Sequence, residues 1–229
     1  MNFMKLERRW RELIILLILV CVTTPIFWLT DLDFQVAALF YYPSEGNNPW
    51  TSQDWWLWNF LYHYASAFTI MTLIGAAATV ALGYFFSKWQ HLRRSAIYLF
   101  LVIALGPGLV VNLVFKDHWG RPRPLHMTEF GGQDHYIPPL QIGHTAGKSF
   151  VCGHCSVGFS VFSLYFLSRK RKGFYFALTL IFSSLLAFTR LTAGGHFLSD
   201  ILWSGYLVFF VAWLVYYSWY ARIDVQITD

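Results

Sequence analysis

The sequence predicts an all-α integral membrane protein, a bundle of six transmembrane helices that forms one domain over residues 1–229. Of the 229 residues, 56% are hydrophobic and only 13% are charged, whereas soluble proteins carry about 25% charged residues. Six apolar stretches approach the length of about 20 residues that crosses a bilayer. Because the basic residues lie in short clusters between these stretches, the net charge of +5 argues against a nucleic-acid-binding surface.

The six apolar stretches follow one another along the whole chain. They are expected at residues 12–30, 60–87, 95–115, 154–168, 173–191 and 197–220. The first follows a basic segment and is interpreted as a retained anchor, since no small-residue cleavage site comes after it. The fourth is short for a bilayer crossing. The sixth contains Asp200 near its start, and acidic residues within membrane helices are usually functional.

Clusters of Lys and Arg predict the orientation of the bundle, because loops rich in these residues stay in the cytoplasm. Such clusters precede the first stretch and follow the second, fourth and sixth: Lys5, Arg8, Arg9, Arg11, Lys88, Arg93, Arg94, 169–172 and Arg222. Both termini are therefore expected in the cytoplasm. The other basic residues fall on the opposite side and require a local explanation: Lys116, Arg121, Arg123, Lys148 and Arg190.

Three polar segments that are far apart in the sequence meet at this outer face. They are residues 116–124, 151–154 and 190–200. Phosphoryl transfer needs cations around the phosphate oxygens, a nucleophile in line with the leaving group, and an acid for the leaving oxygen. Lys116, Arg123 and Arg190 are candidates for the cations, since guanidinium groups match the geometry of phosphate.

The histidines of these segments are candidates for the chemical steps. His196 and Asp200 are four residues apart at the expected start of the sixth helix, on one helical face. Asp200 is expected to accept the Nδ1 proton, which leaves Nε2 of His196 as the nucleophile. His154, at the start of the fourth helix, is expected to protonate the leaving oxygen. Neighbouring glycines and the first amides of both helices are expected to approach the phosphate: Gly153, Gly194 and Gly195.

Some of these residues allow other interpretations. Arg121 is as consistent with an interfacial anchor as with a site residue. Six histidines lie on the outer side, but their spacing is not typical of a metal site, so neither a metal nor a cofactor is predicted. Cys152 and Cys155 resemble a C-x-x-C redox motif without the soluble βαβ context that such motifs have.

The three segments resemble the signature of the type 2 phosphatidic acid phosphatase (PAP2) superfamily, K-x6-R-P, P-S-G-H and S-R-x5-H-x3-D. The matching residues are Lys116, Arg123, Pro124, Gly153, His154, Arg190, His196 and Asp200. Cys152 stands where this family has a serine beside the phosphate, and a thiol is a weaker hydrogen-bond donor. The resemblance implies a metal-independent lipid phosphatase that works through a phosphohistidine.

A narrower resemblance, to bacterial lipid A 4′-phosphatases, is carried by 106–124, 150–153 and 194–197. That subgroup also has a cysteine at the position of Cys152. It implies removal of the 4′-phosphate of lipid A at the periplasmic face of the inner membrane, with the lipid taken from the outer leaflet. The loop 116–153 is then expected to carry the site, and its part 136–148 to cover the head group.

Three alternatives fit the same residues. The substrate could instead be phosphatidylglycerophosphate, undecaprenyl diphosphate or phosphatidic acid. The phosphoryl group could pass to a lipid acceptor rather than to water. A lipid transporter or binding protein would involve no catalysis, but it predicts charges at mid-membrane rather than at one face.

Overall fold

The protein is described by a computed structural model that covers residues 7–43, 49–50 and 56–221. The regular elements within these residues are all helices, which confirms the all-α prediction. Five helices are long and apolar enough to cross a membrane: α1 (Arg8–Leu29), α3 (Trp56–Phe85), α4 (Ser87–Ile103) continued by η2 (Ala104–Lys116), α7 (Lys172–Thr192), and α8 (Leu198–Val215) continued by η5 (Tyr216–Tyr220). The shorter helices are α2 (Leu32–Ala38), η3 (Pro124–His126), η4 (Thr128–Phe130), α5 (Gly153–Phe159) and α6 (Phe162–Leu167).

The fourth predicted span is not one continuous helix. It is divided into α5 and α6, which together form a shorter apolar segment than the other five. Three buried serines in this segment donate their hydroxyls to the carbonyl three residues earlier, at 2.6–2.7 Å: Ser156, Ser160 and Ser163. Such bonds bend helices. The described residues therefore form five long candidate spans and one broken apolar helix where six spans were predicted.

The turn between α3 and α4 is also tighter than predicted. Only Phe86 separates the two helices, so Lys88 and Arg93 belong to the first turns of α4 and not to a loop. Gly83 makes the tight turn possible, because a Cβ there would lie 3.0 Å from the Cβ of Arg93. The basic cluster is still at the end of the hairpin.

The η2 segment is wound more widely than an α-helix, in π-helical form. Pro107 lies inside it, and proline lacks the N–H that a regular helix needs. Asn112 Nδ2 donates a hydrogen bond to the Pro107 carbonyl oxygen at 2.7 Å, which stabilises the irregular backbone. Wide turns of this kind are frequent at functional sites, and η2 ends at Lys116.

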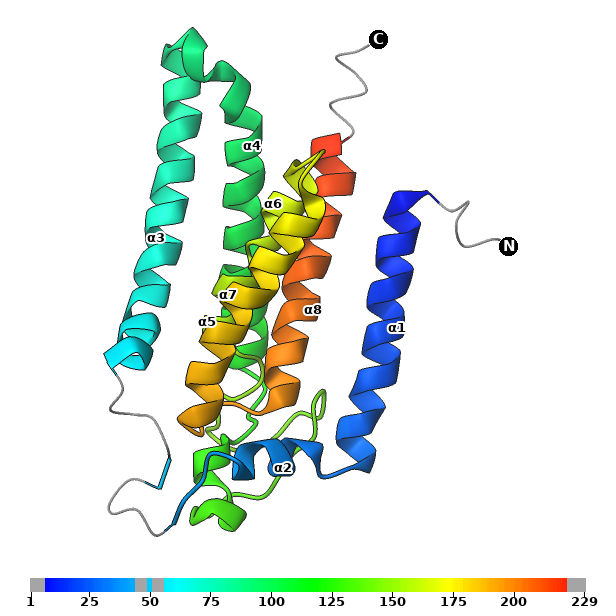
Figure 1. Cartoon of the computed structure of the whole chain (residues 1–229), viewed down its shortest axis with the longest axis vertical. Helices are drawn as coiled ribbons and strands as arrows, with labels where there is room; N and C mark the ends of the chain where they lie inside the picture. The colour runs from blue at the N-terminus through cyan, green and yellow to red at the C-terminus, as the bar shows by residue number, and fades with distance from the viewer. Residues whose placement is uncertain (1–6, 44–48, 51–55, 222–229) are drawn as a thin grey trace.

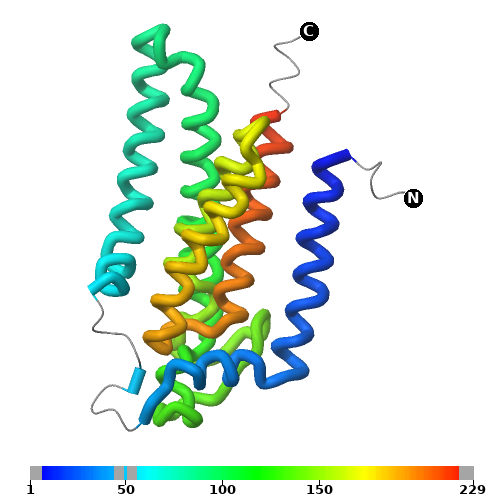
Figure 2. The backbone as a smooth tube through the Cα atoms, viewed as in Figure 1, coloured from blue at the N-terminus to red at the C-terminus, as the bar shows by residue number. Residues whose placement is uncertain are grey.

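The helices run roughly along one axis, and their ends separate two groups of residues (Figures 1 and 2). The start of α1, the α3–α4 turn, the α6–α7 turn and the end of α8 lie at one end of the bundle. The segments predicted to carry the site lie at the other end, where α2 crosses the bundle. Lys5 and Arg222, which belong to the predicted cytoplasmic clusters, are outside the described residues.

Candidate active site

The three polar segments are tied together by backbone hydrogen bonds. The Leu125 amide, next to the first segment, donates to the Gly194 carbonyl at 3.0 Å. The Cys152 amide donates to the Asp200 carbonyl at 3.3 Å, and Ser204 Oγ donates to the Cys152 carbonyl at 2.8 Å. The convergence predicted from topology is therefore present in the structure, and the loops hold it in place.

Gly153 allows α5 to begin directly against the end of η2. A Cβ at this position would lie 2.6 Å from Asn112 Oδ1 and 3.3 Å from Lys116 Nζ. No side chain fits there without displacing both groups. The first turn of α5, which carries His154, is therefore next to the Lys116 ammonium group.

Arg190 is in the last turn of α7 and is almost completely buried. Its guanidinium lies over the ring of Tyr62 at 4.8 Å. A Cβ on Gly195 would lie 2.2 Å from Arg190 Nη2, so this glycine makes room for the guanidinium. Arg190 Nε is buried and has no hydrogen-bond partner among the described residues. Buried donors are normally paired, so Nε is free to bind an anion.

Arg123 faces the same space. Together with Tyr62 and Arg190 it lines a cavity of about 320 Å³. Burial and the nearby positive charge of Arg190 lower the pKa of Arg123, as expected for two cations that share a pocket. Lys116 and His154 line an adjacent cavity of about 270 Å³ between η2, α5 and α3.

Tyr62, which the sequence reasoning did not include, connects these two groups. Its ring stacks on the imidazole of His154, with centroids 4.6 Å apart and an interplanar angle of 14°. The same ring is under the Arg190 guanidinium. Tyr62 comes from α3, so a helix outside the three segments helps to fix a histidine and an arginine of the site.

The hydrogen bonds of His196 differ from the predicted ones. Its Nδ1 is 2.7 Å from the Ser149 carbonyl oxygen, whereas the Asp200 carboxylate is 3.6 Å away. A carbonyl can only accept, so Nδ1 carries the proton and Nε2 keeps its lone pair. The predicted tautomer is retained, but Ser149 rather than Asp200 is the direct partner.

Asp200 is instead the centre of a buried ion network. Its carboxylate accepts hydrogen bonds from Arg121 Nη1, from Ser149 Oγ at 2.6 Å and from the Phe197 amide at 2.8 Å. Because Ser149 bonds both the carboxylate and His196, Asp200 acts on the imidazole through Ser149. The i, i+4 spacing was therefore informative about proximity and not about the direct contact.

Arg121 proves to be neither an interfacial anchor nor a ligand of the cavity. Its side chain is completely buried and pairs with Asp33 at 2.9 Å as well as with Asp200. Burial lowers the pKa of Arg121, but the two carboxylates outweigh that effect, so its pKa is raised. Asp33 comes from α2, at the far end of the sequence from Asp200.

The first amides of α8 do not point at an anion site, contrary to the prediction. The Ser199 amide donates to Asp33 Oδ1 at 2.9 Å, and the Phe197 amide just before the helix donates to Asp200. The two carboxylates occupy the place that a phosphate would take at this helix start. Gly194 also differs from the prediction, since with a φ of 59° it packs on the Trp50 ring and not toward the cavity.

Cys152 and His196 influence each other's protonation. Burial alone would lower the pKa of His196, but the neighbouring Cys152 sulfur and Asp200 raise it above its usual value. Burial would raise the pKa of Cys152, yet a hydrogen bond with the Cys155 side chain, together with His196 and Arg190, lowers this pKa well below its usual value. The Cys155 amide donates to Cys152 Sγ at 3.3 Å, and both thiols are free.

The segment 136–148 divides into two parts. Tyr136 donates its hydroxyl to Asp33 at 2.8 Å, and Trp28 Nε1 donates to the Pro139 carbonyl at 2.9 Å, so the first part is fixed to α1 and α2. The last part, 145–148, lines a cavity of about 390 Å³ together with Arg123. Among the described residues, no group of three or more His, Cys, Asp or Glu side chains is arranged to hold a metal ion.

Comparison with known proteins agrees with this arrangement. Residues 95–224 match the PAP2 superfamily. The chain belongs to the PAP2 superfamily. This confirms the predicted family, and with it the enzyme class, a phosphoric monoester hydrolase. All three polar segments lie within the matching residues, whereas Asp33, Trp50 and Tyr62 precede them.

Relatives within the superfamily cover the chain to different extents. The chain is 36% identical to the lipid A 4′-phosphatase of Francisella tularensis subsp. novicida (strain U112), over 91% of the chain and 96% of that protein. It is 38% identical to the lipid A 4′-phosphatase of Rhizobium leguminosarum, over 49% of the chain and 50% of the relative. A lipid A 4′-phosphatase of Rhizobium etli is similar at 37% identity, over 49% and 46%. No solved structure matches the chain.

Proposed function

We propose that the chain hydrolyses the 4′-phosphate of lipid A at the periplasmic face of a bacterial inner membrane. The observation that carries this proposal is that Lys116, Arg123 and Arg190 line adjoining cavities with His154 in a PAP2 protein, and that His196 interacts with Arg190. The substrate follows from the relative that is similar over 91% of the chain and is named a lipid A 4′-phosphatase.

The orientation is supported by the distribution of charge. The basic clusters on α1, at the start of α4 and between α6 and α7 lie at the end of the bundle opposite the site (Figure 1). Positive charge favours the cytoplasm, so the site faces the periplasm and both termini face the cytoplasm. A chain with both termini on the same side crosses the membrane an even number of times, and the broken helix α5–α6 supplies the sixth crossing.

The mechanism uses the Nδ1 hydrogen bond of His196 and the stacked position of His154 on Tyr62. His196 Nε2 attacks the phosphorus atom in line and forms a P–N bond, while the P–O bond to the sugar breaks. His154 gives its proton to the departing sugar oxygen. Water then attacks the phosphorus atom and gives a proton to His154. The P–N bond to His196 breaks, and inorganic phosphate leaves.

Three cations stabilise the negative charge of the transferring phosphoryl group. Lys116, Arg123 and Arg190 neutralise the negative charge on the equatorial oxygens, as metal ions do in other phosphoryl-transfer enzymes. The unpaired Nε of Arg190 supports this role. Residues 145–148 of the loop 116–153 line the space beside Arg123, which supports contact of this part with the head group.

The test is mass spectrometry of lipid A from cells with and without the protein. We expect loss of one HPO₃ group, placed at the 4′ position by fragmentation, only when the protein is present. Unchanged lipid A would contradict the proposed substrate. Assays of the purified enzyme on phosphatidylglycerophosphate, undecaprenyl diphosphate and phosphatidic acid then separate the alternative substrates, and release of inorganic phosphate separates hydrolysis from transfer to a lipid.

A further inference from the structure

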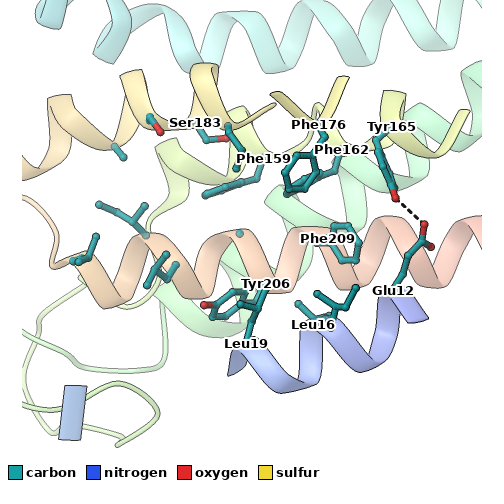
Figure 3. A pocket seen from close by; sticks show the side chains of 18 of the residues that line it. Glu12, Leu16, Leu19, Phe159, Phe162, Tyr165, Phe176, Ser183, Tyr206 and Phe209 are labelled. Carbon is teal, nitrogen blue, oxygen red and sulfur yellow. Dashed lines mark hydrogen bonds between the residues drawn. The ribbon is translucent and has the colours of Figure 1, made fainter. Parts of the chain in front are cut away.

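Another cavity lies within the membrane-spanning part of the bundle, and none of the proposed catalytic or phosphate-binding residues lines it. It has a volume of about 650 Å³, within the range of ligand sites in proteins, about 300–1,000 Å³. We call it the α1 crevice, and its walls are formed by α1, α5–α6, α7 and α8. Figure 3 shows side chains of these helices pointing into one space: Leu16, Leu19, Phe159, Phe162, Phe176, Tyr206 and Phe209.

The crevice is open toward the bilayer. Ile15 and Leu19 of α1 are 48% and 45% exposed, and Phe176 and Phe188 of α7 are 43% and 42% exposed. All four residues line the crevice. Exposed apolar side chains at this depth are in contact with lipid chains in a membrane, so the occupant of the crevice must itself be apolar along its length.

One end of the crevice carries positive charge. Tyr165, which lines that end, has the Arg8 guanidinium 5.3 Å from its ring and the Lys172 ammonium 5.7 Å from it. The only acidic residue that lines the crevice among those described is Glu12. This end of the crevice therefore has two positive charges and one negative charge.

The carboxylate of Glu12 is held by groups of the protein itself. It accepts hydrogen bonds from Arg8 Nε at 2.7 Å, Tyr165 at 2.9 Å and Tyr217 at 2.9 Å, and the bond to Tyr165 is drawn in Figure 3. Arg8 Nη2, by contrast, is buried and has no hydrogen-bond partner among the described residues. An apolar channel thus ends at an unpaired guanidinium N–H and an ammonium group.

We infer that the α1 crevice binds an anionic phospholipid of the cytoplasmic leaflet, with one acyl chain in the crevice and the phosphate at Arg8 and Lys172. Basic residues at the end of membrane helices attract anionic lipid head groups, and the apolar walls accept the chain. The choice of leaflet rests on the orientation proposed above. None of the proposed catalytic or phosphate-binding residues lines the crevice, so lipid binding does not require turnover.

The test compares two lipids with identical acyl chains, phosphatidylglycerol and phosphatidylethanolamine, titrated onto the detergent-solubilised full chain and counted by native mass spectrometry. We expect phosphatidylglycerol to bind more tightly to the wild type. The double variant Arg8→Gln/Lys172→Gln should weaken phosphatidylglycerol binding by about fivefold for each lost charge. Phosphatidylethanolamine binding should change little.

A matched control removes the same charge at the same end. Arg9 pairs with Glu7 and lies over the ring of Trp10, and Arg171 is exposed. The variant Arg9→Gln/Arg171→Gln should therefore keep the preference for phosphatidylglycerol. Equal loss in both double variants would show attraction by net charge alone and would overturn the site.

A second pair of variants tests the crevice itself. Ser184 lines the crevice on α7, so Ser184→Trp should fill it and abolish tight binding of both lipids. Leu185 is exposed on the same helix but does not line the crevice, and Leu185→Trp should bind as the wild type does. If Ser184→Trp does not fold, Ser184→Phe provides the same test. Unchanged binding in the Ser184 variant, or equal affinity of the wild type for both lipids, would mean non-specific lipid contact only.

Discussion

Arg121 and Arg123 are two residues apart in one motif, but they lie in opposite environments. Arg121 is completely buried between Asp33 and Asp200, and each of its guanidinium nitrogens already has a hydrogen-bond partner. Arg123 is half-buried and lines the cavity beside Arg190, and no carboxylate pairs with it among the described ion pairs. Arg123 is therefore available to bind phosphate because none of the described carboxylates pairs with it, whereas Arg121 is already neutralised by two.

The largest effect on activity is expected at His196, the proposed nucleophile. His196→Ala removes the proposed nucleophile and should lower kcat by about 10⁴-fold or more, as measured by phosphate release in detergent. His135→Ala, an exposed histidine of the same outer loop, is the matched control and should retain full activity. Activity of the His196 variant near that of the wild type would contradict the nucleophile assignment.

Arg121→Gln tests the structural side of the comparison. The substitution leaves two buried carboxylates without their cation, which should reduce the free energy of unfolding by about 3–5 kcal/mol. Thermal unfolding in detergent measures the effect, and Arg123→Gln provides the matched substitution with little expected change. Equal stability of the two variants would show that the buried network contributes nothing.

Arg190→Gln tests the catalytic side. Loss of one preorganised cation should lower kcat/KM by about 10²–10³-fold. The unfolding temperature should stay close to that of the wild type, because Arg190 Nε makes no hydrogen bond to the described residues that the substitution would break. Arg190→Lys should recover only part of the activity, since an ammonium lacks the planar fork. A large fall in stability without a fall in kcat/KM would reverse the roles assigned to Arg121 and Arg190.

A smaller effect is expected at Cys152, through the pH dependence of the rate. His196 attacks only in its neutral form, and its raised pKa places the acid limb of the kcat/KM profile above the ordinary histidine value of about 6.5. Cys152→Ser removes the sulfur that contributes to this rise, so the limb should move to lower pH. The maximal rate should change by less than about tenfold. An acid limb that does not move would exclude Cys152 as a cause.

The smallest effect is expected from chelation. If three side-chain cations perform the electrostatic work, EDTA should leave phosphate release unchanged. Restoration of activity by an added divalent metal after such treatment would break this part of the proposal.

Sequence reasoning predicted the helices well where apolar length alone decides, as in α1, α7 and α8. It predicted the bounds of α5–α6 closely, 154–168 against Gly153–Leu167, but not the break between the two helices, because serine hydroxyls that bend a helix and hydroxyls that face solvent have the same composition signal. It also predicted the convergence of Lys116, Arg190 and His196.

The partners of those residues were harder to predict. Ser149 binds His196 through a backbone carbonyl, which no side-chain pattern reveals. Asp33 and Tyr62 reach the site from other helices, so only the tertiary packing brings them there. For Asp33 a weak signal existed, since an acidic residue on the outer side must find a cation, and Arg121 was available.

The stack of Tyr62 between His154 and Arg190 has a consequence for how such enzymes diversify. Tyr62 belongs to α3, which precedes the residues 95–224 that match the superfamily. The motif residues thus lie in one portion of the polypeptide, and a helix from a neighbouring portion packs against two of them. A change in α3 can therefore reposition His154 and Arg190 while every motif residue stays the same.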